Sequence, residues 1–173
     1  MTRHESPIVV AGLDYCRSAY RHDRISGVMV SAVKYRNDRA VVGRFAAELA
    51  HIAALWPSES GADLITWVPT TRARCAARGF DHSALLARGV ARRLGVKARG
   101  LVSRSDHGHQ TGQDRTGRLA GPHLALRRGI VVPRRVIVVD DVITTGASMA
   151  ATAAVLRRGG ARWVTGLAVT HRV

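Results

Sequence analysis

Cysteine and aromatic residues are scarce in this 173-residue sequence, and each shortage excludes certain kinds of structural or binding site. The two cysteines, Cys16 and Cys75, are too few for a disulfide framework and lack the C-x-x-C spacing of a zinc site. We expect both to be buried, inert thiols in a reducing compartment. Aromatic residues make up 5% of the chain, and their positions indicate no platform for stacking nucleobases.

Long hydrophobic runs and internal repeats are also missing. No apolar stretch approaches the roughly 20 residues that a membrane-spanning helix needs. The short apolar stretch at residues 8–13 lies between Glu5 and Asp14, which is not the pattern of a signal peptide. These absences predict a cytoplasmic protein without a membrane span, folded as one unit.

Positive charge is abundant. The chain has 27 Lys+Arg against 12 Asp+Glu, a net charge of +15, and only Lys34 and Lys97 are lysines. An excess of this kind indicates an anionic partner, such as nucleic acid, a phosphorylated metabolite or an acidic surface. For any single arginine, an arginine-rich composition with solvated guanidinium groups is an equally good explanation.

Hydrophobic spacing predicts the regular elements. Apolar residues recur at steps of three and four, typical of helices, over residues 40–56, 82–94 and 147–158. Asp81 is the expected N-cap of the second helix, and Gly159 and Gly160 end the third. Runs of β-branched residues predict strands over residues 64–68, 96–102, 135–139 and 163–169.

The alternation of strands and helices predicts an α/β fold, a single domain with a mainly parallel sheet flanked by helices. We expect residues 1–36 to form an irregular N-terminal segment and residues 37–173 the main domain. Residues 103–122 contain four glycines and few apolar side chains, so they are either a lid over a binding site or a disordered loop. Asp106, His107 and His109 could suggest a metal site, but they do not provide three well-spaced ligands. This favours a solvated loop over a metal site.

The most informative stretch is residues 136–148, Val-Ile-Val-Val-Asp-Asp-Val-Ile-Thr-Thr-Gly-Ala-Ser. Asp140 and Asp141 follow an apolar strand, at the end of a parallel sheet where ligands bind in such folds. Their carboxylates would repel a phosphate but accept hydrogen bonds from sugar hydroxyls. The following loop offers hydroxyl groups, backbone N–H groups and a helix N-terminus, which together suit a phosphate. A ribose 5-phosphate group satisfies both halves, whereas either half alone would more simply be a helix cap or a solvated acid pair.

This stretch resembles the 5-phosphoribosyl-1-pyrophosphate (PRPP) binding motif of type I phosphoribosyltransferases. The resemblance implies that Asp140 and Asp141 are the catalytic residues and hold the ribose hydroxyls. It also implies a 5-phosphate site formed by Ile143, Thr144, Thr145, Gly146, Ala147 and Ser148.

Further segments resemble the ComF-type (competence protein) branch of these proteins. They are Trp67-Val-Pro-Thr-Thr-Arg72, Arg78-Gly-Phe80 and Ala32-Val-Lys-Tyr35. The resemblance implies a small N-terminal hood-like segment and a lid with Gln110, Arg115 and Arg118. It also implies pyrophosphate binding by Thr70, Thr71, Arg72 and Arg78, with Mg²⁺ held mainly through PRPP and no site made by protein alone. The chain departs from that family in lacking a four-cysteine zinc ribbon and in having Asp81-His82 where Asn-Gln is usual.

Two functions remain open from the sequence. One is an enzyme that transfers or hydrolyses the phosphoribosyl group of PRPP, or of another phosphorylated ribose, with Mg²⁺ and release of pyrophosphate. The other is a non-catalytic ComF-type protein that binds PRPP, a nucleotide or, through its basic surface, DNA in competence or recombination. A homodimer is expected in either case.

Overall fold

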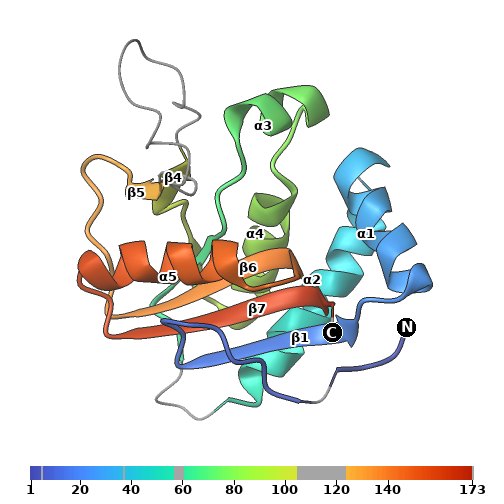
Figure 1. Ribbon diagram of the computed structural model, residues 1–173, viewed down its shortest axis with the longest axis horizontal. Coiled ribbons are helices and arrows are strands. Elements are labelled where there is room, and N and C mark those ends of the chain that lie inside the picture. The colour runs from blue at the N-terminus through green and yellow to red at the C-terminus, as the bar shows by residue number, and fades with distance from the viewer. Residues whose placement is uncertain (5, 37, 57–60, 105–123, 173) are drawn as a thin grey trace, which may run out of the picture.

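A parallel sheet of five strands, in the order β1-β7-β6-β2-β3, forms the centre of the molecule in the computed structural model (Figure 1). The structure describes residues 1–4, 6–36, 38–56, 61–104 and 124–172. The strands are β1 (Tyr15–Arg21), β2 (Leu64–Trp67), β3 (Lys97–Ala98), β6 (Arg135–Ile143) and β7 (Trp163–His171). Two further strands, β4 (Val102–Arg104) and β5 (Leu124–Leu126), pair antiparallel as a separate small sheet. The predicted α/β domain with a mainly parallel sheet is confirmed.

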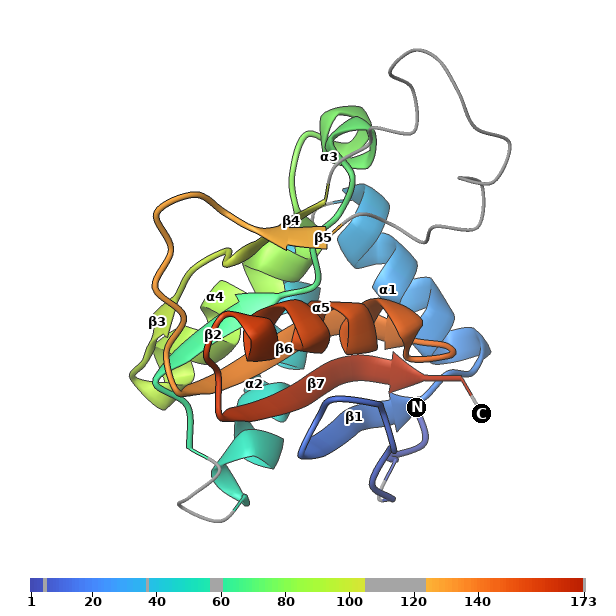
Figure 2. The same cartoon turned by 60° about the vertical axis from the view of Figure 1, so that its left-hand side comes forward.

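Helices cover both faces of this sheet. The helices of the described residues are α1 (Arg24–Arg36), α2 (Arg39–Ala54), α3 (Arg72–Arg78), α4 (His82–Leu94) and α5 (Ala147–Arg158), of which α2, α4 and α5 pack on the sheet. Helix α5 lies on one face and helices α2 and α4 on the other (Figures 1 and 2). Because neighbouring residues of a strand point to opposite faces, Val136 and Val138 of β6 pack with α5, while Ile137 and Val139 pack with α2 and α4. The continuous apolar run of β6 is therefore buried on both sides.

Two glycines allow the layers to approach closely. A Cβ atom at Gly166 of β7 would lie 2.6 Å from Met149 Sδ of α5, and one at Gly89 of α4 would lie 2.7 Å from the Ala46 Cβ atom of α2. Neither position can hold a larger residue unless its neighbour shifts. Nearby, Cys16 is buried as predicted, and this burial raises the pKa of its thiol to about 12, whereas Cys75 is only half-buried.

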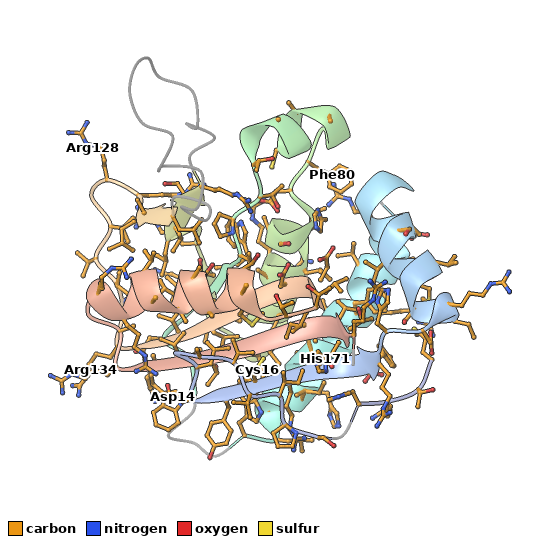
Figure 3. The ribbon with its side chains drawn as sticks, in the orientation of Figure 1. Asp14, Cys16, Phe80, Arg128, Arg134 and His171 are labelled. Atoms are coloured by element: carbon orange, nitrogen blue, oxygen red, sulfur yellow. The ribbon has the colours of Figure 1, made fainter. Side chains whose placement is uncertain are left out.

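Ion pairs join elements at the amino-terminal end of the sheet. Asp63, just before β2, accepts two hydrogen bonds from the Arg135 guanidinium at the start of β6, at 3.0 and 2.7 Å. These bonds hold the pKa of Asp63 below its ordinary value. Asp14, just before β1, pairs with Arg157 at the end of α5 at 2.6 Å. Figure 3 shows Asp14 and His171 at opposite ends of the sheet.

The predicted helices at 82–94 and 147–158 match α4 and α5 residue for residue, with Asp81 capping α4. Strand β6 is longer than the predicted 135–139, because its parallel partner β7 continues to His171 and pairs with Ile143. The predicted strand 96–102 is wrong, since that segment is divided between β3 and β4 in two different sheets. Helix α3 was not predicted.

The expectation of irregular structure over residues 1–36 is corrected by β1 and α1. Strand β1 pairs with β7 at the edge of the sheet, and its charged residues Arg17 and Arg21 conceal the strand pattern. Helix α1 begins after Asp23, whose Oδ1 accepts a hydrogen bond from the Ser26 N–H at 2.7 Å. The division of the chain at residue 36 stays a prediction. Within the described residues, no helix is long and apolar enough to cross a bilayer.

Candidate functional site

The two acidic residues of the motif lie in β6 itself, near its carboxyl-terminal end. Asp140 is half-buried and Asp141 is buried, with only 6% of its surface exposed. The backbone N–H of Asp141 donates to Asp140 Oδ1 at 2.8 Å, which fixes the first carboxylate against the strand. The sequence pattern predicted both acids after the strand, but pairing with β7 extends the strand past them.

The loop between β6 and α5 has the geometry expected of an anion site. Gly146 is the N-cap of α5 with φ +74°, a conformation that favours glycine, and a Cβ atom there would lie 3.1 Å from Val10 Cγ2. It has no side chain to cap the first turn of α5, although Thr145 Oγ1 accepts a hydrogen bond from the Ala147 N–H at 3.4 Å. Around it, Thr144, Thr145, Ala147 and Ser148 are exposed to solvent, and Ile143 is buried.

The loop after β2 reaches the same end of the sheet. The Val68 N–H donates to the Val139 carbonyl of β6 at 3.0 Å, so Thr70 and Thr71 follow β2 beside the acid pair of β6. Both threonines are half-buried, and the Thr71 carbonyl accepts from the Cys75 N–H at 3.0 Å as α3 begins. The structure thus brings together the predicted ribose, phosphate and pyrophosphate loops. The side chains of Arg72 and Arg78 lie outside what the structure describes.

The first turn of α4 supplies contacts that the sequence did not predict. His82 Nε2 lies 3.0 Å from Asp141 Oδ2, and both side chains are buried. The next residue, Ser83, places its Oγ 3.5 Å from Asp140 Oδ1. Asp81 accepts from the Ala84 N–H at 3.1 Å and from Trp67 Nε1 at 3.0 Å, which ties this turn to the end of β2. The sequence signal at this turn is a short polar run, Asp81-His82-Ser83, at the start of the helix.

Two other predicted groups cannot be placed. The lid residues Gln110, Arg115 and Arg118 and the histidines at 107 and 109 lie outside the described residues. Among the residues that are described, no group of three or more His, Cys, Asp or Glu side chains could hold a metal ion.

Comparison with known structures shows the same fold in larger enzymes. Glutamine PRPP amidotransferase from B. subtilis, complexed with ADP and GMP, superposes with a TM-score of 0.51 at 24% identity. The match covers 76% of this chain but 26% of that enzyme, so this chain spans about a quarter of its length. Adenine phosphoribosyl transferase from Trypanosoma brucei, solved with AMP, pyrophosphate and ribose-5-phosphate, has a TM-score of 0.54 and 14% identity, over 95% of this chain and 74% of that one.

Sequence comparison was made with curated proteins and with protein families. No curated protein matches the chain. The model of the phosphoribosyl transferase domain matches residues 81–173, more than half of the chain and a range that includes α4, β6 and α5. The chain therefore belongs to the phosphoribosyl transferase domain family.

Proposed function

We propose that this protein binds PRPP and transfers, or releases to water, its phosphoribosyl group with loss of pyrophosphate. The observation that carries the proposal is the continuity of the acid pair of β6 with the Gly146 loop and the start of α5. Asp140 and Asp141 would accept hydrogen bonds from the ribose hydroxyls. The loop from residue 143 to residue 148 would bind the 5-phosphate through backbone N–H groups, hydroxyls and the helix N-terminus.

In the proposed reaction, the bond from the anomeric carbon to the pyrophosphate oxygen breaks, and its electron pair leaves with pyrophosphate. A lone pair of the acceptor forms the new bond to the same carbon, and the acceptor then loses a proton to solvent water. Positive charge develops on the ribose as the bonds change, and in this proposal the carboxylates of Asp140 and Asp141 would stabilise it. Thr70 and Thr71 would contact the leaving pyrophosphate, together with Arg72 and Arg78. Mg²⁺ bound through the pyrophosphate oxygens would neutralise part of the charge of the leaving group.

Ligand binding tests the proposal directly. A ligand that binds only the native state adds RT ln(1 + [L]/Kd), about 2.7 kcal/mol at a hundredfold excess over Kd. We expect PRPP with Mg²⁺ to raise the unfolding temperature, and Asp140→Asn with Asp141→Asn to abolish most of that rise. The matched control is Asp38→Asn with Asp63→Asn, which removes the same charge away from the site. An equal rise in both double variants would refute the ribose assignment.

Pyrophosphate release separates catalysis from binding alone. Production of pyrophosphate from PRPP, with or without added nucleobases, would show turnover by the wild-type chain. PRPP binding without turnover would instead favour the non-catalytic, ComF-type alternative, which rests on the resemblance of residues 67–72 and 78–80 to that family. A homodimer, tested by sedimentation, is part of the same proposal.

A basic groove favours nucleic acid as a second candidate ligand. A cavity of about 530 Å³ runs between α2 and α4, and no acidic residue lines it among those described. Four exposed arginines line it, Arg39, Arg88, Arg92 and Arg93. Of these, Arg93 donates to the carbonyls of Gly89 and Gly43 and so links α4 to α2.

A salt series tests this second candidate. DNA affinity should fall steeply with salt, and changing Arg39, Arg88 and Arg92 to Gln should lower the slope by about 0.9 for each phosphate that these arginines neutralise. The control changes Arg128, Arg134 and Arg158, which are exposed elsewhere, and Figure 3 shows the first two pointing into solvent. An equal reduction of the slope in the two triple variants would indicate attraction to the overall charge and no role for the groove.

A further inference from the structure

We propose that His82 is a positioning residue for Asp141, and that it sets the affinity of the site for the sugar of its ligand but not for the phosphate. This inference rests on the proposed function, because it assigns Asp141 to the ribose hydroxyls. It concerns a residue in α4, which is separate from the β6 motif in the chain, and it predicts a selective effect on one part of the ligand.

The geometry of the contact carries the inference. His82 Nε2 lies 3.0 Å from Asp141 Oδ2, and the two side chains are only 6% and 8% exposed. A buried imidazole in close contact with one carboxylate oxygen restricts the rotation of the carboxylate about its Cβ–Cγ bond. A hydroxyl group that binds Asp141 then meets an acceptor that is already oriented, which reduces the entropy lost on binding.

The first turn of α4 makes a longer contact with Asp140 than with Asp141. The Ser83 hydroxyl is 3.5 Å from Asp140 Oδ1, at the limit of hydrogen-bond distance, whereas the His82 contact with Asp141 is short and buried. Asp141 is also the more buried of the two acids, so it depends more on a partner within the protein. The N-terminus of α4, with its partial positive charge, adds to the stabilisation of both carboxylates.

The position of His82 is itself held firmly. Asp81, its neighbour, caps α4 through the Ala84 N–H and accepts from the Trp67 indole at the end of β2. Since β2 pairs with β6, the imidazole and the carboxylate are carried by elements that are fixed to each other. The contact is thus part of the scaffold on which the ligand is bound.

Two small ligands separate sugar affinity from phosphate affinity. Ribose 5-phosphate contacts both halves of the proposed site, and ethyl phosphate contacts only the loop from residue 143 to residue 148. The dissociation constant of ethyl phosphate divided by that of ribose 5-phosphate, both measured by ³¹P NMR titration, reports the contribution of the sugar. In His82→Leu, which removes the polar contact with Asp141, we expect this ratio to fall by about tenfold or more, while ethyl phosphate affinity stays the same.

Three further variants complete the test. His82→Gln keeps an N–H donor and should retain most of the sugar contribution, so it serves as the conservative rescue. His51→Leu, at an exposed position in the last turn of α2, is the matched control and should leave both affinities unchanged. His82→Met replaces the Leu variant if that variant does not fold, since a flexible thioether fills a similar space without an N–H donor.

The outcomes distinguish the inference from the proposed function. If the wild-type chain binds ribose 5-phosphate no more tightly than ethyl phosphate, the ribose assignment fails. If the wild type discriminates and His82→Leu or His82→Met discriminates equally well, the role of His82 is refuted. If Gln and Leu variants both lose discrimination to the same extent, a polar contact with Asp141 is not the cause, and the inference is likewise overturned.

Discussion

The indole N–H of Trp67 donates to Asp81 Oδ2 at 3.0 Å, and this bond joins the end of β2 to the N-cap of α4. The same Asp81 caps α4 through its other carboxylate oxygen, so one side chain serves both elements. Because the next two residues contact the acid pair, the Trp67–Asp81 bond also holds the first turn of α4 against the site.

Trp67→Phe should therefore destabilise the fold by about 1–3 kcal/mol beyond the loss of apolar surface, since it removes a hydrogen bond to a charged group. The matched control is Trp163→Phe, because the buried Trp163 Nε1 has no hydrogen-bond partner among the described residues. Urea unfolding of both variants gives the comparison. Equal destabilisation would show that the Trp67–Asp81 bond contributes nothing.

Because α2 packs closely on α4, we expect substitution by alanine to have opposite effects on stability at Gly89 and at Gly43. Gly89→Ala places a methyl group 2.7 Å from the Ala46 Cβ atom and should cost about 1–3 kcal/mol through overpacking. Gly43→Ala meets nothing within 4 Å and should stabilise the fold by up to about 1 kcal/mol through helix propensity. Ala46→Gly should restore space in the Gly89→Ala variant, and failure of this rescue would place the strain elsewhere.

Gly146 and Gly79 separate backbone strain from crowding, since both have φ +74°. Alanine at either position should cost about 1–2 kcal/mol for a left-handed conformation. At Gly146 the new Cβ atom also meets Val10 Cγ2 at 3.1 Å, whereas at Gly79 nothing lies within 4 Å. We expect a larger loss of unfolding free energy at Gly146, reduced by Val10→Ala; equal losses at the two sites would contradict the crowding.

Stability should depend on pH through His171, whose pKa is lowered below its ordinary value of 6.5 by burial and by the charge of His4. His171 Nδ1 lies 3.4 Å from His4 Nε2. Near and below pH 6.5 the unfolded chain therefore binds more protons at this residue than the native chain. The stabilisation is present above pH 6.5 and is lost as the pH falls below it.

Unfolding free energies measured between about pH 5 and pH 7.5 test this dependence. His171→Gln should flatten part of the slope, while His51→Gln, at an exposed position, should leave it unchanged. The contribution of Asp63 is separate. Its pKa is lowered by Arg135, so its stabilisation persists until the pH falls through 3.8 and below. An unchanged slope in His171→Gln would assign the acid sensitivity to other groups.

Strong local patterns account for what could be predicted from the sequence. Helices α4 and α5 have a clear apolar spacing with polar or glycine boundaries, and the β6 motif is contiguous in the chain. Strand β1 and helix α1 were missed, because an edge strand with arginines has a weak pattern and depends on pairing with β7. The contact of His82 with Asp141 joins two segments far apart in the chain, and no local pattern indicates it.

The ion pairs at the amino-terminal end of the sheet have a consequence for how the protein can change over evolution. Asp63–Arg135 and Asp14–Arg157 lie where the parallel strands begin, and the acid pair of β6 lies where that strand ends. Loss of the ionic part of such a pair alters stability by about 1 kcal/mol or less and leaves the carboxyl-terminal end of the sheet in place. Adaptation to temperature or salt can therefore proceed at one end of the strands while ligand selectivity diverges independently at the other.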